Sequence, residues 1–447
     1  MGVIMFQDKK LLSLSQVVMF GLAYMTPIIV LGTFGILAMV TSGAVSGAYV
    51  VALVAMLFTA HSYGRMACAF PVAGSAYAYV RHAIGERLGF MAGWAIILDY
   101  LFLPMVIWLI GAAYLNSAFP VVSTTIWLMG FIIITTIINI IGLKLASAIN
   151  GVMMLIQILV IVAFVALAIR YLLVDASRPV FSLEPFIGTE GVTGALPMLM
   201  AGAAIACYSF LGFDAVTTLT EETRDPRRTM PRAILLITLI GGLIFVVVSY
   251  FVQQAAPGGL FTNPDAAAYD IAHNIGGDLF VSVFLIGLVV GQFASGIAAQ
   301  ASGARILYAM GRDGLLPRRL LGQLGRFGTP FGGLILSGIV ALLALTMDVL
   351  SAASFINFGA FVAFAMVNLA VISHYFVREK HRGLRGVTFF LLFPLLGLLA
   401  IMWLMFSLDI RALSLGGAWL GIGILWLCWL TRGFRNSMPV LTSLSSA

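Results

Sequence analysis

Apolar runs of about 20 residues recur along the whole chain, and each is long enough to cross about 30 Å of hydrocarbon as a helix. Helices are favoured there because a helix satisfies its backbone hydrogen bonds internally. The composition agrees, since 62% of the 447 residues are hydrophobic and 9% are charged, whereas soluble domains are about a quarter charged. The sequence therefore predicts an all-α integral membrane protein without a separate soluble domain.

The runs indicate about twelve spanning helices in one transmembrane domain covering residues 1–447. The expected spans begin near residues 16, 47, 88, 124, 148, 195, 233, 279, 332, 352, 387 and 413. Loop charge tests this count, because Lys and Arg beside a spanning helix favour the cytoplasm. All but three of the 24 Lys and Arg residues then lie on one side, the exceptions being Arg170, Arg178 and Arg411. Both termini are therefore expected in the cytoplasm, and the cation-free loop 257–278 is expected outside.

Several classes of function are disfavoured by the remaining composition. The formal net charge of +7 comes from cations in short loops, which are topology signals rather than a nucleic-acid surface. The cysteines, Cys68, Cys207 and Cys428, lie in or beside apolar runs and are expected to be small buried hydrophobes. The histidines lack metal-ligand spacing, and no Gly-rich phosphate loop occurs. We expect no metal, no cofactor, no nucleic-acid partner and no enzyme activity.

Two expected spans contain residues that interrupt a helix. The first reads "MFGLAYMTPIIVLGTFG" and holds Pro27 among several glycines, and the sixth reads "YSFLGFDAV", with Gly212 between aromatic residues. Proline removes a backbone donor and glycine lowers the cost of unwinding. Unwound backbone persists at membrane depth only beside protein or a water-filled cavity. The alternative is an ordinary proline kink with packing glycines.

Breaks in spans one and six are typical of an inverted five-plus-five repeat, in which each half contributes one discontinuous helix to a midplane binding site. We therefore expect a first repeat over about 14–173, a second over about 195–376, and two extra helices over about 387–432.

Only two acids, Asp99 and Asp214, lie well inside expected spans, and no Lys or Arg lies at that depth. A carboxylate there costs on the order of 3 kcal/mol, so it normally faces a cavity, a partner or a proton path. Both are candidates for binding a cationic substrate or carrying a coupling proton. The alternative for each is a structural hydrogen bond, especially for Asp99 near its helix end.

Glu221 and Glu222 follow at the cytoplasmic end of the sixth span and precede "TRDPRRTMPR", which reads as a Pro-punctuated basic loop. They are further coupling candidates if they gate an inner vestibule. The simpler alternative is a solvated loop whose charges pair internally.

Aromatic residues gather near the breaks and the acids, and aromatic rings can bind an amine through cation–π attraction. The members of this group are Tyr24, Tyr77, Tyr79, Trp94, Tyr100, Tyr208, Phe210 and Phe213. Each alone is more typical of packing. Together they favour a pocket for an organic cation or a zwitterion.

Five ordered stretches carry a resemblance to a known family. They are "GLAYMTP", "FPVAGSAYAYVRHAIGERLGFMAGWAIILDYLFLP", "SFLGFDAVTTLTEETRDPRRTMPRAI", "RILYAMGRDGLLP" and "INFGAFVAFAMVNLAV". The chain resembles the amino acid, polyamine and organocation superfamily of secondary transporters over nearly its whole length, and within it the bacterial putrescine importers. The resemblance implies that the unwound segments Tyr24–Pro27 and Tyr208–Phe213 contact substrate, and that Phe213 helps to occlude the substrate. This adds Met25, Thr26 and Ser209 to the candidate substrate-binding residues.

Two departures from the family bear on coupling and substrate. Gln157 lies near the place where some proton-coupled relatives have a lysine, so the resemblance does not identify the proton carrier. Gly32 stands where the putrescine importers have an aspartate, which weakens a diamine assignment, while Pro27 removes a backbone donor that would hold a carboxylate.

Taken together, these features predict a secondary transporter in a bacterial cytoplasmic membrane that imports a small amine such as putrescine with protons. An amino acid permease or exchanger is the alternative within transport, and a non-transporting receptor or scaffold is the alternative outside it.

Overall fold

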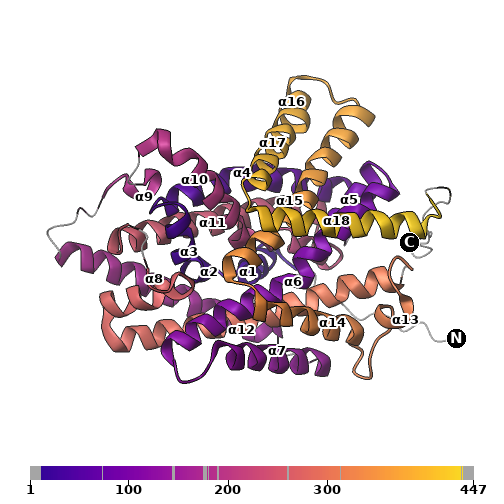
Figure 1. Cartoon of the computed structure of the whole chain (residues 1–447). Coiled ribbons are helices and arrows are strands. Elements are labelled where there is room, and N and C mark those ends of the chain that lie inside the picture. Colours follow the sequence, from indigo (N-terminus) through magenta and orange to yellow (C-terminus); the bar gives the residue numbers. More distant parts are fainter. Residues whose placement is uncertain are drawn as a thin grey trace.

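The computed structural model is a bundle of helices (Figure 1). The structure describes residues 12–72, 74–142, 146–174, 179, 181–188, 191–258, 261–312, 314–433 and 435. Within these residues no strand forms, and a single parallel bridge pairs Leu12 with Thr223. Arg178 and both chain termini, whose placement the loop charges predict, lie outside the described residues.

The helices follow one another in the order that the apolar runs predict. They are α1 (Leu14–Met25), α2 (Ile29–Gly32), α3 (Phe34–Val40), α4 (Val45–Ala69), α5 (Ser75–Ala83), α6 (Glu86–Ala118), α7 (Thr124–Ile141), α8 (Ala146–Val174), α9 (Glu184–Ile187), α10 (Gly191–Ala206), η1 (Cys207–Phe210), η2 (Ala215–Glu222), α11 (Pro226–Ala255), η3 (Pro264–Ala266), α12 (Ala267–Arg312), α13 (Arg318–Leu321), α14 (Phe331–Ala341), η4 (Leu342–Thr346), α15 (Val349–Val371), η5 (Ile372–Arg378), α16 (Leu384–Val387), η6 (Thr388–Leu392), α17 (Phe393–Phe406) and α18 (Ile410–Leu430).

Eleven helices of the described residues are long and apolar enough to cross a membrane. The shorter apolar helix Phe331–Thr346, formed by α14 and η4, occupies the place of the expected ninth span. This agrees with an all-α membrane protein of about twelve helices. Arg170 lies in the last turns of α8 and Arg411 in the first turn of α18.

Burial divides the helices into a centre and a lipid-facing shell. The most apolar 18-residue window of α6 is 100% buried inside the protein, whereas that of α18 is 17% buried. Figure 1 shows α6 crossing the middle of the bundle, with α7 along one edge and α17 along the opposite edge. Exposed Ile and Leu on the outer helices suit lipid, whereas α6 is placed to contribute side chains to a central site.

Two expected loops are helical instead. The stretch 226–232, read as a basic loop, forms the first two turns of α11. Pro226 stands in the first turn, where a missing N–H costs nothing. Pro231 leaves the carbonyl of Arg227 without its helical donor, and the Cys68 thiol donates to that carbonyl at 3.1 Å. Of the cysteines expected to be buried hydrophobes, Cys207 is buried, whereas Cys68 and Cys428 are only half-buried, and the Cys68 thiol has a polar partner.

The prediction of an outer loop over residues 257–278 is also wrong in part. It becomes helical at η3 and continues into α12, which bends at Gly277, where φ is +69°. An alanine-rich face containing Ala267, Ala268, Ile271 and Ala272 is buried, so this segment packs on the bundle as an amphipathic helix.

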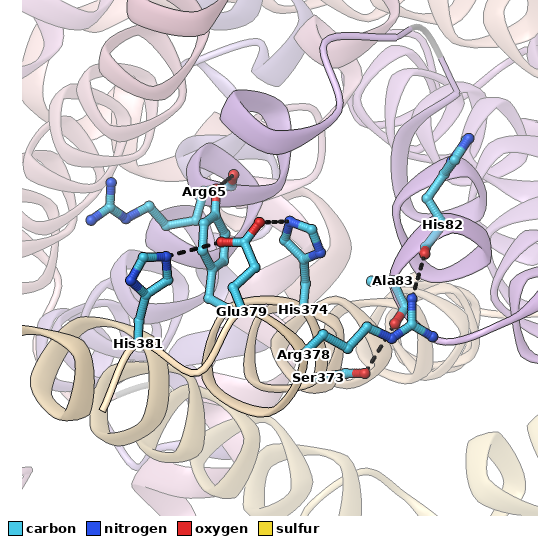
Figure 2. A network of polar contacts seen from close by, with 9 residues as sticks. Arg65, His82, Ala83, Ser373, His374, Arg378, Glu379 and His381 are labelled. Atoms are coloured by element: carbon cyan, nitrogen blue, oxygen red, sulfur yellow. Dashed lines mark hydrogen bonds and ion pairs between the residues drawn. The ribbon is translucent and has the colours of Figure 1, made fainter. Parts of the chain in front are cut away.

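A polar network joins the end of α15 to α5 (Figure 2). Glu379 pairs with His374 at 3.2 Å and with His381 at 3.0 Å. Arg378 donates to the carbonyls of His82 and Ile84, and the Ser373 hydroxyl donates to the carbonyl of Ala83. We call these groups the η5 network. Within it, Arg378 and Ser373 satisfy carbonyls left over where α5 ends.

Candidate functional site

The first spanning helix is broken, as Pro27 predicts. Helix α1 ends at Met25, and Thr26 takes a left-handed conformation with φ +50° before α2 begins at Ile29. Pro27 has no N–H for the carbonyl of Ala23, and the Thr26 hydroxyl donates to that carbonyl at 3.3 Å. A threonine held in this conformation is strained, and such strain is typical of functional sites.

The sixth spanning helix is broken at Gly212, again as expected. Helix α10 tightens into the 3₁₀-helix η1, Gly212 has φ +119°, and the chain resumes as η2. The Asn357 side chain of α15 donates to the carbonyls of Ala204 and Ile205 at 2.8 and 3.3 Å. It therefore satisfies carbonyls near the point where the helical ladder changes.

The two breaks touch each other. A Cβ on Gly212 would lie 2.4 Å from Cδ1 of Tyr24, so the absence of a side chain there lets the Tyr24 ring approach. Tyr49 of α4 adds a second link, because its hydroxyl lies 3.0 Å from the Ser209 hydroxyl and 3.3 Å from the Thr33 hydroxyl. The broken helices are thus held against one another at membrane depth.

A small cavity lies where the breaks meet. Its lining residues are Tyr24, Met25, Thr26, Ile29, Leu103, Ile107, Tyr208, Leu211, Gln292 and Ser295. A second cavity shares Tyr24 and Ser295 with the first, and its lining residues are Phe20, Ala23, Tyr24, Met153, Gln157, Ala294, Ser295 and Ala298. Each has a free volume of about 20 Å³, room for about one water molecule. A small organic substrate therefore fits only after the Tyr24 side chain or the helices move.

Both acids inside the membrane lie beside this region. Asp214 is 1% exposed, and its Oδ2 accepts from the Ser75 and Tyr100 hydroxyls, each at 3.4 Å. Asp99 is 3% exposed, and its Oδ1 has no hydrogen-bond partner. Asp99 lies one turn from Leu103 on α6, so it shares a helix face with a residue that lines the cavity. An unpartnered buried carboxylate oxygen is suited to an ammonium group or a proton.

The structure places the other candidate substrate residues in two groups. Tyr24, Met25, Thr26 and Tyr208 line the cavity. Ser209, Phe210 and Phe213 turn into the surrounding helices: Ser209 meets Tyr49, the Phe210 ring lies 5.2 Å from the Phe245 ring, and the Phe213 ring lies 5.2 Å from the Phe364 ring.

Three further aromatic candidates, on α6 and the neighbouring α5, have different surroundings. Tyr100 donates to Asp214, as described above. Trp94 faces α18, where its indole and that of Trp419 stack at 5.0 Å and each donates to the other's carbonyl. Tyr77 packs against Gly93 of α6, and neither Tyr77 nor Trp94 is among the residues that line the cavity.

Glu221 and Glu222 end η2 with exposed side chains, away from the cavity. The carbonyl of Glu222 accepts from the N–H of Leu12 at 2.8 Å, and the N–H of Arg224 donates to the carbonyl of Leu12 at 2.9 Å. Backbone pairing therefore joins the start of the first broken helix to the end of the sixth.

Three polar residues of this region were missed in the sequence: Tyr49, Gln292 and Asn357. Each lies in an apolar run whose hydropathy the single polar group hardly changes. The quoted stretch "INFGAFVAF" contains Asn357, but the contact with α10 is a tertiary one that no local pattern encodes.

Two discontinuous helices whose breaks meet at a buried cavity, within a bundle of spanning helices, define a membrane transporter of the broken-helix type. Comparison with known proteins agrees, since a profile of the amino acid permease family matches residues 12–429. The chain belongs to this family. It is a multi-pass membrane transporter and not an enzyme.

Individual relatives cover nearly the whole chain. The low-affinity putrescine importer PlaP of Escherichia coli (strain K12) is 39% identical over 96% of this chain and 96% of its own length. The branched-chain amino acid permease BcaP of Bacillus subtilis (strain 168) is 29% identical over 90% and 88%. The methylthioribose transporter of the same organism is 27% identical over 85% and 82%.

Proposed function

We propose that this protein is a secondary active transporter that imports a small amine, with putrescine as the leading candidate, across a bacterial cytoplasmic membrane. The carrying observation is the cavity between the two breaks, with an unpartnered Asp99 oxygen one helical turn from its wall. None of the described residues that line the cavity is basic, so an ammonium group meets no like charge there. The similarity to a putrescine importer supports the same substrate class.

In this proposal Asp99 binds the ammonium group, because its Oδ1 has no partner in the protein. Asp214, which two hydroxyls already contact, is the candidate carrier of the coupling proton. Glu221 and Glu222 lie farther out and contribute to an inner vestibule. The two five-helix repeats rock around the cavity to expose it to either side, with both termini in the cytoplasm.

Transport into proteoliposomes tests the proposal. Radiolabelled putrescine is offered with and without an inward proton gradient, and unlabelled amines and amino acids are added as competitors. We expect saturable putrescine uptake that the gradient accelerates, with decarboxylated compounds competing better than their parent amino acids. Uptake that ignores the gradient would contradict proton coupling alone.

An amino acid permease is the second candidate, favoured by the similarity to BcaP. It predicts the reverse order of competition, because the substrate carboxylate would then be required. The same competition series therefore decides between the two candidates.

A further inference from the structure

Three buried hydroxyls form a hydrogen-bonded chain between the two broken helices. The Tyr49 hydroxyl of α4 lies 3.0 Å from the Ser209 hydroxyl of η1 and 3.3 Å from the hydroxyl of Thr33, the residue between α2 and α3. The Thr33 hydroxyl in turn donates to the carbonyl of Ile29 at 3.1 Å. All three side chains are at most 2% exposed, and hydrogen bonds removed from water in this way are stronger than exposed ones.

The chain of hydroxyls ends behind the wall of the cavity. Ile29, whose carbonyl ends the chain on one side, lines the cavity, and so do Tyr208 and Leu211, which flank Ser209 in the sequence. None of the three hydroxyl-bearing residues is among the described residues that line it. The chain therefore ties the α2 wall of the cavity to the η1 wall without itself reaching the cavity.

The Tyr49 ring is held in place independently of its hydroxyl. It packs against the Phe245 ring of α11 with 5.4 Å between the ring centroids, and the Phe210 ring of η1 packs against the same Phe245 ring at 5.2 Å. Tyr49→Phe would therefore keep this aromatic packing and interrupt the chain of hydroxyls at its middle. The substitution separates the effect of the hydrogen bonds from the effect of the packing.

The same helix carries a second buried hydroxyl pair, which serves as a comparison. The hydroxyl of Ser46, three residues before Tyr49, lies 3.1 Å from the Ser249 hydroxyl of α11, and both serine side chains are 0% exposed. This contact joins α4 to α11, each of which is one continuous helix. The two contacts on α4 are alike in chemistry and burial, but the one made by Ser46 does not reach either break.

We propose that Tyr49 is a positioning residue that fixes the distance between the α2 and η1 walls of the cavity. This inference rests on the proposed function and deepens it, because Ser209 then acts through Tyr49 instead of contacting the substrate. A wall that is already in place adds no ordering cost to binding, whereas a loose wall must be ordered by the substrate itself. Loss of the Tyr49 hydroxyl therefore weakens binding of the amine more than it slows the transport step.

Initial rates of radiolabelled putrescine uptake into proteoliposomes containing the full chain test this inference. The measured quantities are the half-saturating concentration and the maximal rate. We expect Tyr49→Phe to raise the half-saturating concentration about tenfold and to keep the maximal rate within about twofold of wild type. Thr33→Val should act like Tyr49→Phe, whereas Thr33→Ser, which keeps a hydroxyl, should act like the wild type.

Ser209→Ala distinguishes action through Tyr49 from direct contact with the substrate. We expect this variant alone to raise the half-saturating concentration about as far as Tyr49→Phe does, and the double variant to raise it no further. Additive effects of the two substitutions would mean that Ser209 contacts the substrate itself, and they would overturn the inference.

Ser46→Ala is the matched control. It should lower the melting temperature about as much as Tyr49→Phe, because each removes a buried hydroxyl partner, and it should leave both uptake parameters unchanged. Equal half-saturating concentrations in Ser46→Ala and Tyr49→Phe would assign the chain of hydroxyls to fold stability alone and overturn this inference. A wild-type protein that imports an amino acid but not putrescine overturns the proposed substrate alone, and the variants are then compared with that amino acid. A wild-type protein that imports neither overturns both proposals.

Discussion

The η5 network, which is partly exposed, and the buried central cavity differ in how their polar groups are satisfied. In the network, Glu379 pairs with two histidines, and Arg378 and Ser373 complete the end of α5 (Figure 2). Around the cavity, Tyr24, Asp99, Gln157 and Gln292 each keep at least one buried polar atom without a partner. The named side chains of the network all have partners within the protein. In the proposed mechanism, the groups near the breaks that lack a partner meet what the protein transports.

The largest effect is expected at Asp99. Asp99→Asn keeps the size of the side chain and removes its charge, so an ammonium loses its counter-ion at membrane depth. We expect putrescine uptake to fall at least about 100-fold, measured as initial rates in proteoliposomes.

Asp214→Asn should abolish acceleration by a proton gradient. Uptake that is normal at every pH in Asp214→Asn would remove Asp214 from the mechanism.

Gly212→Ala should produce the next largest loss. The substitution forces a side chain into a conformation with φ +119° and places Cβ 2.4 Å from the Tyr24 ring. We expect uptake to fall about 30-fold, together with a lower melting temperature. Gly130→Ala is the control, since a Cβ there meets nothing within 4 Å, and it should leave uptake unchanged.

Asn357→Leu tests a side chain that supports one of the breaks, because its amide nitrogen donates to two carbonyls at the end of α10. Without the amide, the carbonyls of Ala204 and Ile205 lose a donor inside the membrane. We expect a loss of about 1–3 kcal/mol in unfolding free energy, followed by thermal melting in detergent. An unchanged melting temperature would mean that water or other donors replace the amide.

Glu379→Gln should have the smallest effect. The Glu379 side chain is 41% exposed, and exposed ion pairs contribute about 0–1 kcal/mol. Uptake should stay within about twofold of wild type. A loss as large as that of Asp99→Asn would break the comparison, because the network would then take part in transport.

Much of the fold follows from sequence patterns with a local cause. Pro27 and Gly212 change the backbone itself, so both breaks fall where they were predicted. The first turns of α11 were missed because Pro226 and Pro231 resemble loop residues, and only the thiol of Cys68 shows how the second is accommodated.

The site is harder to predict from the sequence, because the hydrogen-bond partners of its side chains come from segments that are distant in the chain. Gln292 and Gln300 give the same local signal, and only the packing of neighbouring helices separates the open amide from the satisfied one. Trp94 precedes Asp99 by five residues, about 140° around the helix, so it faces α18 rather than the side of the acid.

The bridge between Leu12 and Thr223 has a consequence for mutagenesis. It is made by backbone groups, with hydrogen bonds from Leu12 to Glu222 and from Arg224 to Leu12. A scan that exchanges side chains one at a time would therefore leave these hydrogen bonds in place even though they join the two broken helices. Only proline, which deletes the N–H itself, would uncover the connection.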